Sequence, residues 1–202
     1  MKRLSLALPS VLLLLAAPFA TAAHQPAAGE EAPAFSLSSQ EGAAVTLDQN
    51  KGKWVVLYFY PKDFTSGCTV EAHNFQRDLA KYEKANAVIL GVSVDSVDSH
   101  KGFCAKEGLN FKLLADTEAV VTKTYGSLST YGDKTFSARN TFLIDPAGVI
   151  RKVYVKVSPA THSDDVLADL AAFQRLDAIE SPSRPPEPST RRRASSSGLS
   201  SS

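Results

Sequence analysis

The 202-residue chain is poor in sulfur, with two cysteines, Cys68 and Cys104, and a single methionine at position 1. Neither cysteine belongs to a Cys-x-x-Cys motif, and His73 lies five residues after Cys68, a spacing that does not share a helix face. No other His or Cys has the spacing of metal ligands. We therefore expect no metal site, which leaves the two thiols as the residues of interest.

The chain also lacks a marked excess of either charge and has no phosphate-binding glycine loop. Its formal net charge is +1, and removal of Lys2 and Arg3 would leave −1. No steering toward polyanions follows from this balance, so we expect no nucleic-acid partner. Internal repeats are absent, and no apolar stretch after residue 20 approaches transmembrane length.

Residues 1–23 have the pattern of a secretory signal peptide. Lys2 and Arg3 precede an apolar stretch over residues 4–20, and small residues follow it. An uncleaved membrane anchor is the alternative, but the stretch is near the short limit for spanning a bilayer and contains Pro9. We therefore expect an exported protein, periplasmic or secreted, with no stable membrane insertion after the signal is cleaved.

Residues 181–202 are rich in Pro, Ser and Arg and nearly free of large apolar side chains. Such a segment cannot bury enough surface to order itself, so we expect a disordered tail. Its three consecutive arginines, residues 191–193, are compatible with an acidic partner, but a solvated tail is the simpler interpretation. The remaining residues, 27–176, are enough for one domain with a full core.

Apolar strands and amphipathic helices alternate within this domain, which predicts an α/β fold with a mixed sheet covered by helices on both faces. A turn sequence at residues 145–148 joins the last two strands as an antiparallel hairpin. We expect Thr65 to cap the first helix, and Asp98 or Ser99 to cap the second, which Gly108 ends. The expected strands are 54–60, 87–94, 111–115, 141–145 and 149–155, and the expected helices are 65–84, 98–107, 117–125 and 163–176.

Cys68 follows a buried-strand pattern and falls in the first turn of a predicted helix. Pro61 ends the apolar run 54–60, because proline has no N–H to donate to a sheet, and Thr65 is a suitable N-cap. The partial positive charge at a helix N-terminus favours a thiolate over a thiol. A reactive cysteine needs this setting, although a cysteine on the apolar face of a helix can also be an inert small hydrophobe.

The spacing Pro61-x-x-x-Thr65-x-x-Cys68 resembles the active-site signature of the peroxiredoxins, and the string VVLYFYPKDFTSGCTVEA resembles their bacterioferritin-comigratory, or Q-type, branch. The likeness continues through LGVSVDS, LNFKLLAD, KTYG and RNTFLIDPAGVI and covers residues 27–176. It implies a thioredoxin-like three-layer fold and a thiol peroxidase that reduces hydrogen peroxide and organic hydroperoxides without cofactor or metal. We also expect a monomer.

Efficient peroxide reduction needs more than an ionised sulfur, because nucleophilicity falls as a thiol becomes more acidic. Hydrogen-bond donors aimed at the peroxide would stabilise the charge that moves onto the leaving oxygen. The candidates are the backbone N–H groups of Gly67 and Cys68, the Thr65 hydroxyl and the Arg139 guanidinium. The resemblance implies that Thr65 and Arg139 hold the peroxide and the thiolate.

Two more residues gain a role from the resemblance. Pro61 would shield the pocket from water, and Glu71 matches a position that often orients the arginine in this family. Each residue also has a simpler explanation: Pro61 as a strand end, Thr65 as a cap, Arg139 as a solvated loop charge, and Glu71 as a favourable acid in a first helical turn. Their order and spacing, taken together, favour the catalytic interpretation.

Cys104 is the candidate resolving cysteine. Many Q-type relatives carry that cysteine five residues after the reactive one, where this chain has His73, whereas others carry it on the next helix, as here. A sulfenic acid at Cys68 must condense with a thiol or risk over-oxidation. Bringing the two residues together requires the first turn of one or both helices to unwind. A static disulfide and a buried free thiol are the alternatives.

The sequence thus predicts a peroxidase in which a Cys68 sulfenic acid is resolved by Cys104 to an intramolecular disulfide, which a thioredoxin-like dithiol then reduces. For an exported protein we expect that reductant to be an exported thiol carrier. A thiol–disulfide oxidoreductase, a redox-sensing module without turnover and a scaffold with a permanent disulfide are the alternatives on the same fold.

Overall fold

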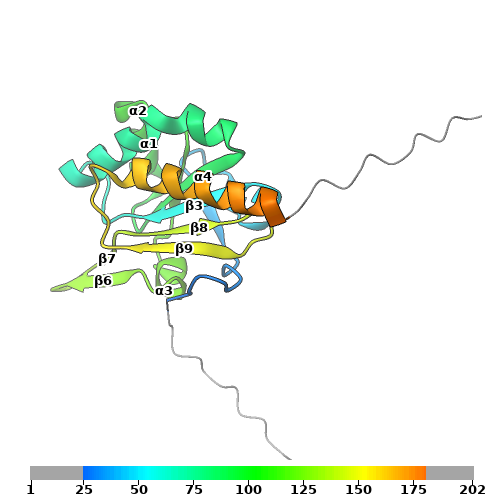
Figure 1. Ribbon diagram of the computed structural model, residues 1–202. Coiled ribbons are helices and arrows are strands. Elements are labelled where there is room, and N and C mark those ends of the chain that lie inside the picture. The colour runs from blue at the N-terminus through cyan, green and yellow to red at the C-terminus, as the bar shows by residue number, and fades with distance from the viewer. Residues whose placement is uncertain (1–24, 181–202) are drawn as a thin grey trace, which may run out of the picture.

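A seven-stranded mixed sheet runs through the centre of the computed structural model, which describes residues 25–180 (Figure 1). The predicted signal peptide and the predicted tail lie outside these residues. The strands follow the order β2-β1-β5-β4-β3-β8-β9. Their bounds are β1 Ser36–Ser39, β2 Ala44–Thr46, β3 Trp54–Phe59, β4 Ala87–Ser93, β5 Lys112–Ala115, β8 Asn140–Ile144 and β9 Ile150–Val155.

Helical crossovers join the parallel strands of this sheet. The helix α1, Ser66–Lys84, leads from β3 to β4, and α2, Val97–Glu107, leads from β4 to β5. The pairs β3–β4 and β4–β5 are parallel, whereas β8 pairs antiparallel with β3 and with β9. A separate antiparallel hairpin is formed by β6, Leu128–Tyr131, and β7, Lys134–Ser137.

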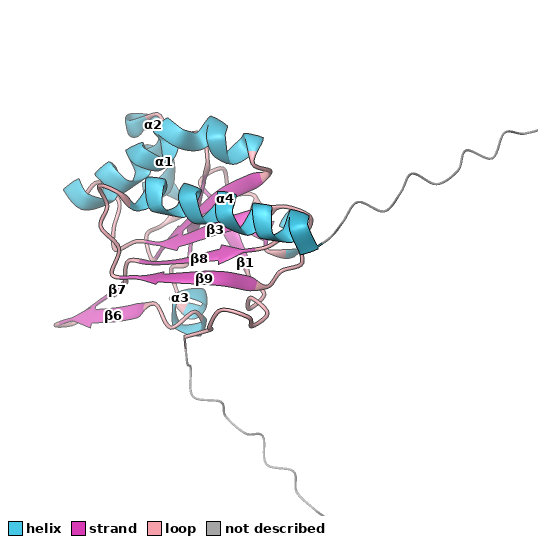
Figure 2. Cartoon of the chain, in the orientation of Figure 1, coloured by secondary structure: helices cyan, strands magenta, loops and turns pink. Residues whose placement is uncertain are grey.

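Helices cover both faces of the sheet. Figures 1 and 2 show α1, α2 and α4, His162–Glu180, on one face and the short α3, Val120–Thr124, on the other. This arrangement confirms the predicted α/β class with a central mixed sheet between two helical layers. The predicted hairpin of the last two strands is confirmed as β8–β9.

The central strand β3 divides the core into two halves, because successive side chains of a strand point to opposite faces. Val56 and Tyr58 pack with residues of α1, α2 and α4, whereas Leu57 and Phe59 pack with Tyr125 on the α3 side. All six residues of β3 are buried. Burial of each large apolar side chain stabilises the fold by about 1.5–3 kcal/mol, so β3 is a firm base for the loop that follows it.

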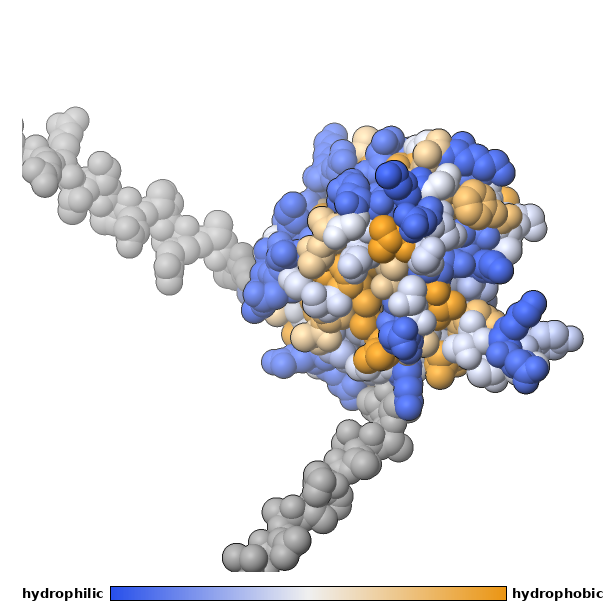
Figure 3. Space-filling view, turned by 180° about the vertical axis from the view of Figure 1, so that it is seen from behind, coloured by the Kyte–Doolittle hydropathy of each residue, from blue (hydrophilic) through white to orange (hydrophobic). Residues whose placement is uncertain are grey.

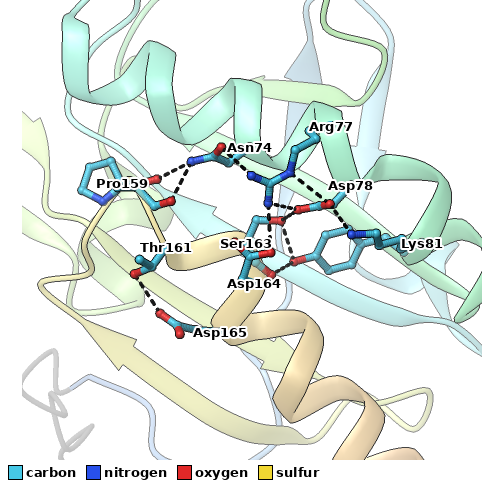
Figure 4. A network of polar contacts seen from close by, with 11 residues as sticks. Asn74, Arg77, Asp78, Lys81, Pro159, Thr161, Ser163, Asp164 and Asp165 are labelled. Carbon is cyan, nitrogen blue, oxygen red and sulfur yellow. Dashed lines mark hydrogen bonds and ion pairs between the residues drawn. The ribbon is translucent and has the colours of Figure 1, made fainter.

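A polar network joins α1 to the start of α4 (Figure 4). Its centre is Asp78, whose carboxylate is fully buried. This carboxylate accepts hydrogen bonds from Arg77, from Lys81 at 2.8 Å and from the Ser163 hydroxyl at 2.9 Å. Arg77 also donates to Asp164 at 3.0 Å. Together these contacts hold the two helices side by side.

The local predictions were wrong at two helix starts. The cap of α2 is Ser96, whose hydroxyl accepts from the Ser99 N–H at 3.2 Å, rather than Asp98 or Ser99. The helix predicted over 117–125 is shorter, because Asp116 first forms a turn and its carboxylate then accepts backbone N–H groups of α3. Gly108 ends α2 with a left-handed backbone, as predicted.

The outer surface mixes apolar and polar side chains. On the face opposite that of Figure 1, hydrophobic residues lie among hydrophilic ones (Figure 3). Among residues 25–180, no helix combines the length and the apolar character that crossing a bilayer requires. The exposed large apolar side chains come from several separate elements: Phe64, Val70, Val120, Leu128, Tyr131, Val155, Leu176 and Ile179.

Candidate active site

Cys68 lies in the first turn of α1, immediately after the loop that leaves β3. The helix begins at Ser66 with Thr65 at the predicted N-cap position, but the expected cap is wrong, because the Thr65 side chain makes no hydrogen bond to the helix. The side chain of Cys68 is 1% exposed and belongs to the core cluster on the α1 side of the sheet. Burial alone disfavours a charged sulfur, whereas the helix N-terminus favours it. The balance therefore depends on what else the sulfur contacts.

The guanidinium of Arg139 provides that contact. Its Nη2 donates to the Sγ of Cys68 at 3.1 Å. The pairing of β3 with β8 explains how a residue so far along the chain arrives there. Tyr58 stands opposite Thr141 in this antiparallel pair, so the register extended by two residues places Arg139 opposite the residue that follows β3. A fixed cation beside a sulfur stabilises its thiolate form.

Glu71 holds the other side of the same guanidinium. Arg139 Nη1 donates to Glu71 Oε2 at 2.5 Å, and the Glu71 side chain is only 1% exposed. Burial raises the pKa of Glu71 to about 7, although the charge of Arg139 pulls it down. Glu71 and Cys68 thus contact different nitrogens of the same guanidinium. The predicted orienting residue does contact the arginine.

Gly67 allows the guanidinium to approach the helix. A Cβ atom built at Gly67 would lie 2.8 Å from Arg139 Nη2, closer than real Cβ atoms approach. The hydrogen on Gly67 thus leaves the space that the arginine occupies next to Cys68. The backbone N–H groups of the first turn of α1 have no intrahelical partner, and they point out of the N-terminal end of the helix, where Cys68 and Arg139 lie.

No contact of Thr65 or Pro61 with the Cys68 sulfur is among the hydrogen bonds and groove linings of the described residues. The Thr65 hydroxyl donates to the Lys62 carbonyl at 2.9 Å and makes no capping hydrogen bond to the helix. Thr65 is exposed, and Pro61 is half-buried. Pro61 lines a neighbouring groove of about 630 Å³ with residues such as Tyr131, and the lining of this groove does not include Cys68.

Cys104 is buried on α2, in the same core cluster as Cys68. Its side chain is 8% exposed, and both thiols are free. Burial raises the pKa of Cys104 to about 11, so at neutral pH it is a protonated thiol. The structure shows both thiols reduced, with no bond between Cys68 and Cys104.

A buried polar cluster that the sequence did not indicate joins the loop before Cys68 to α2. The Asp63 carboxylate, in a residue that is 3% exposed, accepts from the Tyr60 hydroxyl at 2.7 Å and the Ser99 hydroxyl at 2.7 Å. His100 Nδ1 lies 2.9 Å from the same carboxylate. A histidine among the apolar positions of α2 was the one available signal. Among residues 25–180, no group of three or more His, Cys, Asp or Glu is arranged to hold a metal ion.

Comparisons with known proteins identify relatives of this chain that are peroxiredoxins by name. The family model described as the AhpC/TSA family matches residues 28–153. Peroxiredoxin Bcp of Xanthomonas campestris is 42% identical over 143 residues, which are 69% of this chain and 89% of that protein. Chloroplastic peroxiredoxin Q of Sedum lineare is 43% identical, over 72% of this chain and 78% of that protein.

Solved structures give the same result. Peroxiredoxin Q of Xanthomonas campestris superposes with a TM-score of 0.66 at 40% identity, over 75% of this chain and 98% of that one. A PrxQ mutant of Xylella fastidiosa reaches a TM-score of 0.70 at 34% identity, with the same two coverages. A further neighbour at 40% identity and a TM-score of 0.66, over 69% of this chain and 91% of that one, is the bacterioferritin comigratory protein of Xanthomonas campestris, in a study of its alkyl peroxide reduction activity.

Proposed function

We propose that Cys68 is the residue that attacks the peroxide. The chain belongs to the AhpC/TSA family and is a peroxiredoxin related to the Bcp and Q proteins. The observation that carries this assignment is the 3.1 Å hydrogen bond from Arg139 to the sulfur of Cys68 at the start of α1. No other cysteine of residues 25–180 has an arginine contact of this kind.

In the first step the Cys68 thiolate attacks one oxygen of the peroxide, and the O–O bond breaks. The sulfur keeps that oxygen as a sulfenic acid, and the other oxygen leaves and takes up a proton to give water or an alcohol. Arg139 and the first-turn N–H groups stabilise the negative charge that develops on the leaving oxygen. Hydrogen peroxide and organic hydroperoxides are the proposed substrates, and the alkyl peroxide activity of one relative supports the second class.

In the second step the Cys104 thiol attacks the sulfenic sulfur, water leaves, and a Cys68–Cys104 disulfide forms. A thioredoxin-like dithiol then reduces this disulfide by thiol–disulfide exchange and becomes oxidised in turn. Both cysteines are buried and free in the structure, and we infer that Cys104 leaves its core position by local unfolding of α2 when the bond forms.

The assignment is tested by peroxide consumption with a thioredoxin system, comparing the wild type with Cys68→Ser and Cys104→Ser. We expect Cys68→Ser to abolish consumption, and Cys104→Ser to retain one turnover but lose thioredoxin-driven cycling. Equal consumption by all three proteins would overturn the proposal. Oxidation of Cys68 without any turnover in the wild type would instead indicate a redox sensor.

Export and a monomeric state complete the proposal. The signal-peptide pattern of residues 1–23 supports export, and the N-terminal sequence of the protein from its host tests it. We expect the mature chain to begin near His24, and recovery of residues 1–23 on the mature protein would contradict this.

A monomeric state is supported by the exposed apolar side chains, which lie on separate elements. Light scattering of the reduced protein should give the mass of one chain rather than two.

A further inference from the structure

Asp63 ties the active-site loop to the helix that carries Cys104. Its buried carboxylate receives three donors, and two of them, the hydroxyl of Ser99 at 2.7 Å and Nδ1 of His100 at 2.9 Å, belong to α2. The third is the Tyr60 hydroxyl at 2.7 Å. Burial by itself would raise the pKa of Asp63, but the hydrogen bonds from His100, Tyr60 and Ser99 outweigh it and leave the pKa below its ordinary value. The carboxylate is therefore charged, and hydrogen bonds to a buried charge are the strong kind.

The backbone of the same residue is fixed as well. The Asp63 N–H donates to the Asp95 carboxylate at 2.9 Å, and that carboxylate also accepts from the Ser93 hydroxyl at 2.7 Å. Ser93 ends β4, and Asp95 lies in the connection to α2. The loop before Cys68 is thus attached both to α2 and to the connection that precedes it.

Phe64 adds an aromatic contact at the next position. Its ring lies edge-on to Phe103 of α2, with centroids 5.1 Å apart, and Lys106 of the same helix lies 5.5 Å from its centroid. Phe64 is 49% exposed and has a φ of 60°, in the left-handed region that costs a non-glycine residue about 1–2 kcal/mol. The contacts of Asp63 and Phe64 with the helix oppose the relaxation of this backbone.

These contacts bear on Cys104 because of its place on α2. It lies one helical turn after His100 and next to Phe103, which is fully buried. For Cys104 to reach Cys68, this part of the helix must leave the core, and the bonds to Asp63 must break or reform with water. The closed state, in which α2 is packed in the core, also contains an unsatisfied polar group. Nε2 of the fully buried His100 has no hydrogen-bond partner among residues 25–180. An unpaired buried polar group lowers the cost of opening.

We propose that Asp63 is a positioning residue that holds α2 closed in the reduced enzyme and thereby sets the rate at which Cys104 resolves the Cys68 sulfenic acid. This inference rests on the proposed function, because Cys104 has to be the resolving thiol. Opening of α2 precedes the bond-forming step, so the rate of resolution scales with the fraction of molecules that are open.

The consequence is a competition for the sulfenic acid. In the open state the Cys104 thiol displaces water from the sulfenic sulfur, and a disulfide forms. In the closed state a second peroxide can instead oxidise the sulfenic acid to a sulfinic acid, releasing water or an alcohol. A tighter hold of Asp63 on α2 therefore favours over-oxidation, and a looser hold favours the disulfide.

The test compares Asp63→Asn with Asp78→Asn as a matched control. Both residues are buried aspartates that join two elements, but Asp78 joins α1 to α4 and has no contact with α2 in the network described (Figure 4). The reduced proteins receive one equivalent of hydrogen peroxide, and quenched samples are analysed by mass spectrometry for sulfenic acid, disulfide and, with excess peroxide, sulfinic acid.

We expect Asp63→Asn to convert sulfenic acid to disulfide about tenfold faster than the wild type or more, as the loss of charge-assisted hydrogen bonds implies. Its sulfinic fraction should fall, and its rate of sulfenic acid formation should change by less than about threefold. Asp78→Asn should lose stability without changing the rate of disulfide formation. A milder variant, Ser99→Ala, removes one donor to Asp63 and should raise the rate roughly threefold.

Hydrogen exchange gives a second readout that does not depend on the chemistry. In a Cys104→Ser background, the α2 amides should exchange faster in the Asp63→Asn variant while those of α4 stay protected. Resolution and α2 exchange equal to the wild type in both Asp63→Asn and Ser99→Ala would overturn this inference and leave the proposed function standing. Absence of a Cys68–Cys104 disulfide in the oxidised wild type would overturn the proposed resolving role of Cys104, on which this inference rests.

Discussion

Arg139 shares one guanidinium between the sulfur of Cys68 and the carboxylate of Glu71. A fully ionised Glu71 would draw the positive charge to itself, but its burial opposes ionisation. The guanidinium is thus held between the two side chains, by Nη1 to Glu71 and by Nη2 to Cys68. This arrangement depends on distances of about 3 Å and on exclusion of water, so small changes in the nearby backbone should affect the chemistry more than the stability.

Gly67→Ala tests that dependence. The added methyl group would lie 2.8 Å from Arg139 Nη2, so the guanidinium has to move away from Cys68. We expect kcat/KM for peroxide to fall about 10- to 100-fold, which is the range for loss of a charge-assisted hydrogen bond. The free energy of unfolding should stay the same or rise by up to about 1 kcal/mol, because alanine is the better helix former.

Gly102→Ala is the matched control for this substitution. A methyl group there would meet only the Phe64 ring, at an ordinary contact distance of 3.6 Å, and we expect kcat/KM for peroxide, which reports the attack by Cys68, to stay close to that of the wild type. Full activity of Gly67→Ala, or an equal loss in both variants, would show that the position of Arg139 is not what matters.

The sequence predicted which individual residues form the candidate site, and the structure shows which of them are in contact. The pairing of Arg139 with Cys68 and Glu71 fits the expected roles, because a short motif fixes which side chains leave the start of α1. The contact of Asp63 with His100 was not predicted, since the two residues are 37 positions apart and neither belongs to a pattern that indicates the other. The packing of α2 alone brings them together.

Among the elements, α4 depends on a buried histidine at its first residue. His162 is 1% exposed, and its Nε2 lies 2.8 Å from the Thr141 hydroxyl of β8. Its ring also contacts Phe75 of α1 and Tyr154 of β9 edge-on. Burial lowers the pKa of His162 to about 4 from an ordinary value of 6.5. The charged form therefore does not fit between the helix and the sheet.

This histidine should make the fold sensitive to acid. Between pH 6.5 and about 4 the unfolded chain binds a proton that folded His162 does not, so the free energy of unfolding falls as the pH is lowered. The loss should be about 2 kcal/mol between about pH 7.5 and about pH 4.5. Urea unfolding of the wild type and of His162→Phe, which cannot titrate, measures it as the difference in pH dependence.

Comparing the two proteins matters because Glu71 acts in the opposite direction. Its raised pKa makes the folded state lose stability as the pH rises from 4.5 toward 7, and this contribution is present in both proteins. Parallel pH profiles for the wild type and His162→Phe would show that His162 accepts a proton in the folded state.

The strands that the sequence did not predict differ in composition from the strands that it did predict. The buried strand β3 is a continuous apolar run, and β8 ends in the apolar run Phe142–Ile144, so pattern alone identifies both. In contrast, β1, β6 and β7 have sequences such as SLSS, LSTY and KTFS. β1 pairs with β5, which is distant in the sequence, whereas β6 and β7 pair with each other across the turn at Gly132 and Asp133. The local sequence of β1 has no signal for its distant partner, whereas Gly132-Asp133 is a two-residue signal of a hairpin that was not predicted.

In the whole molecule, the fold brings three distant segments to one end of the sheet. The loop after β3 and the start of α1 provide Asp63 and Cys68, the strand β8 provides Arg139 through its register with β3, and α2 provides Cys104. The order of elements, and thus the fold class, was predictable from the alternation of patterns and from the family resemblance. Distances and contacts were not, because they depend on register and helix packing.

The central claim is that Arg139 and the start of α1 hold Cys68 as a reactive thiolate. Its most direct test is the second-order rate constant for sulfenic acid formation at Cys68, measured by mass spectrometry in Cys104→Ser protein with and without Arg139→Gln. We expect a rate far above that of free cysteine, and a decrease of about 100-fold on loss of the arginine. A rate equal to that of free cysteine, or one unchanged in Arg139→Gln, would contradict the claim.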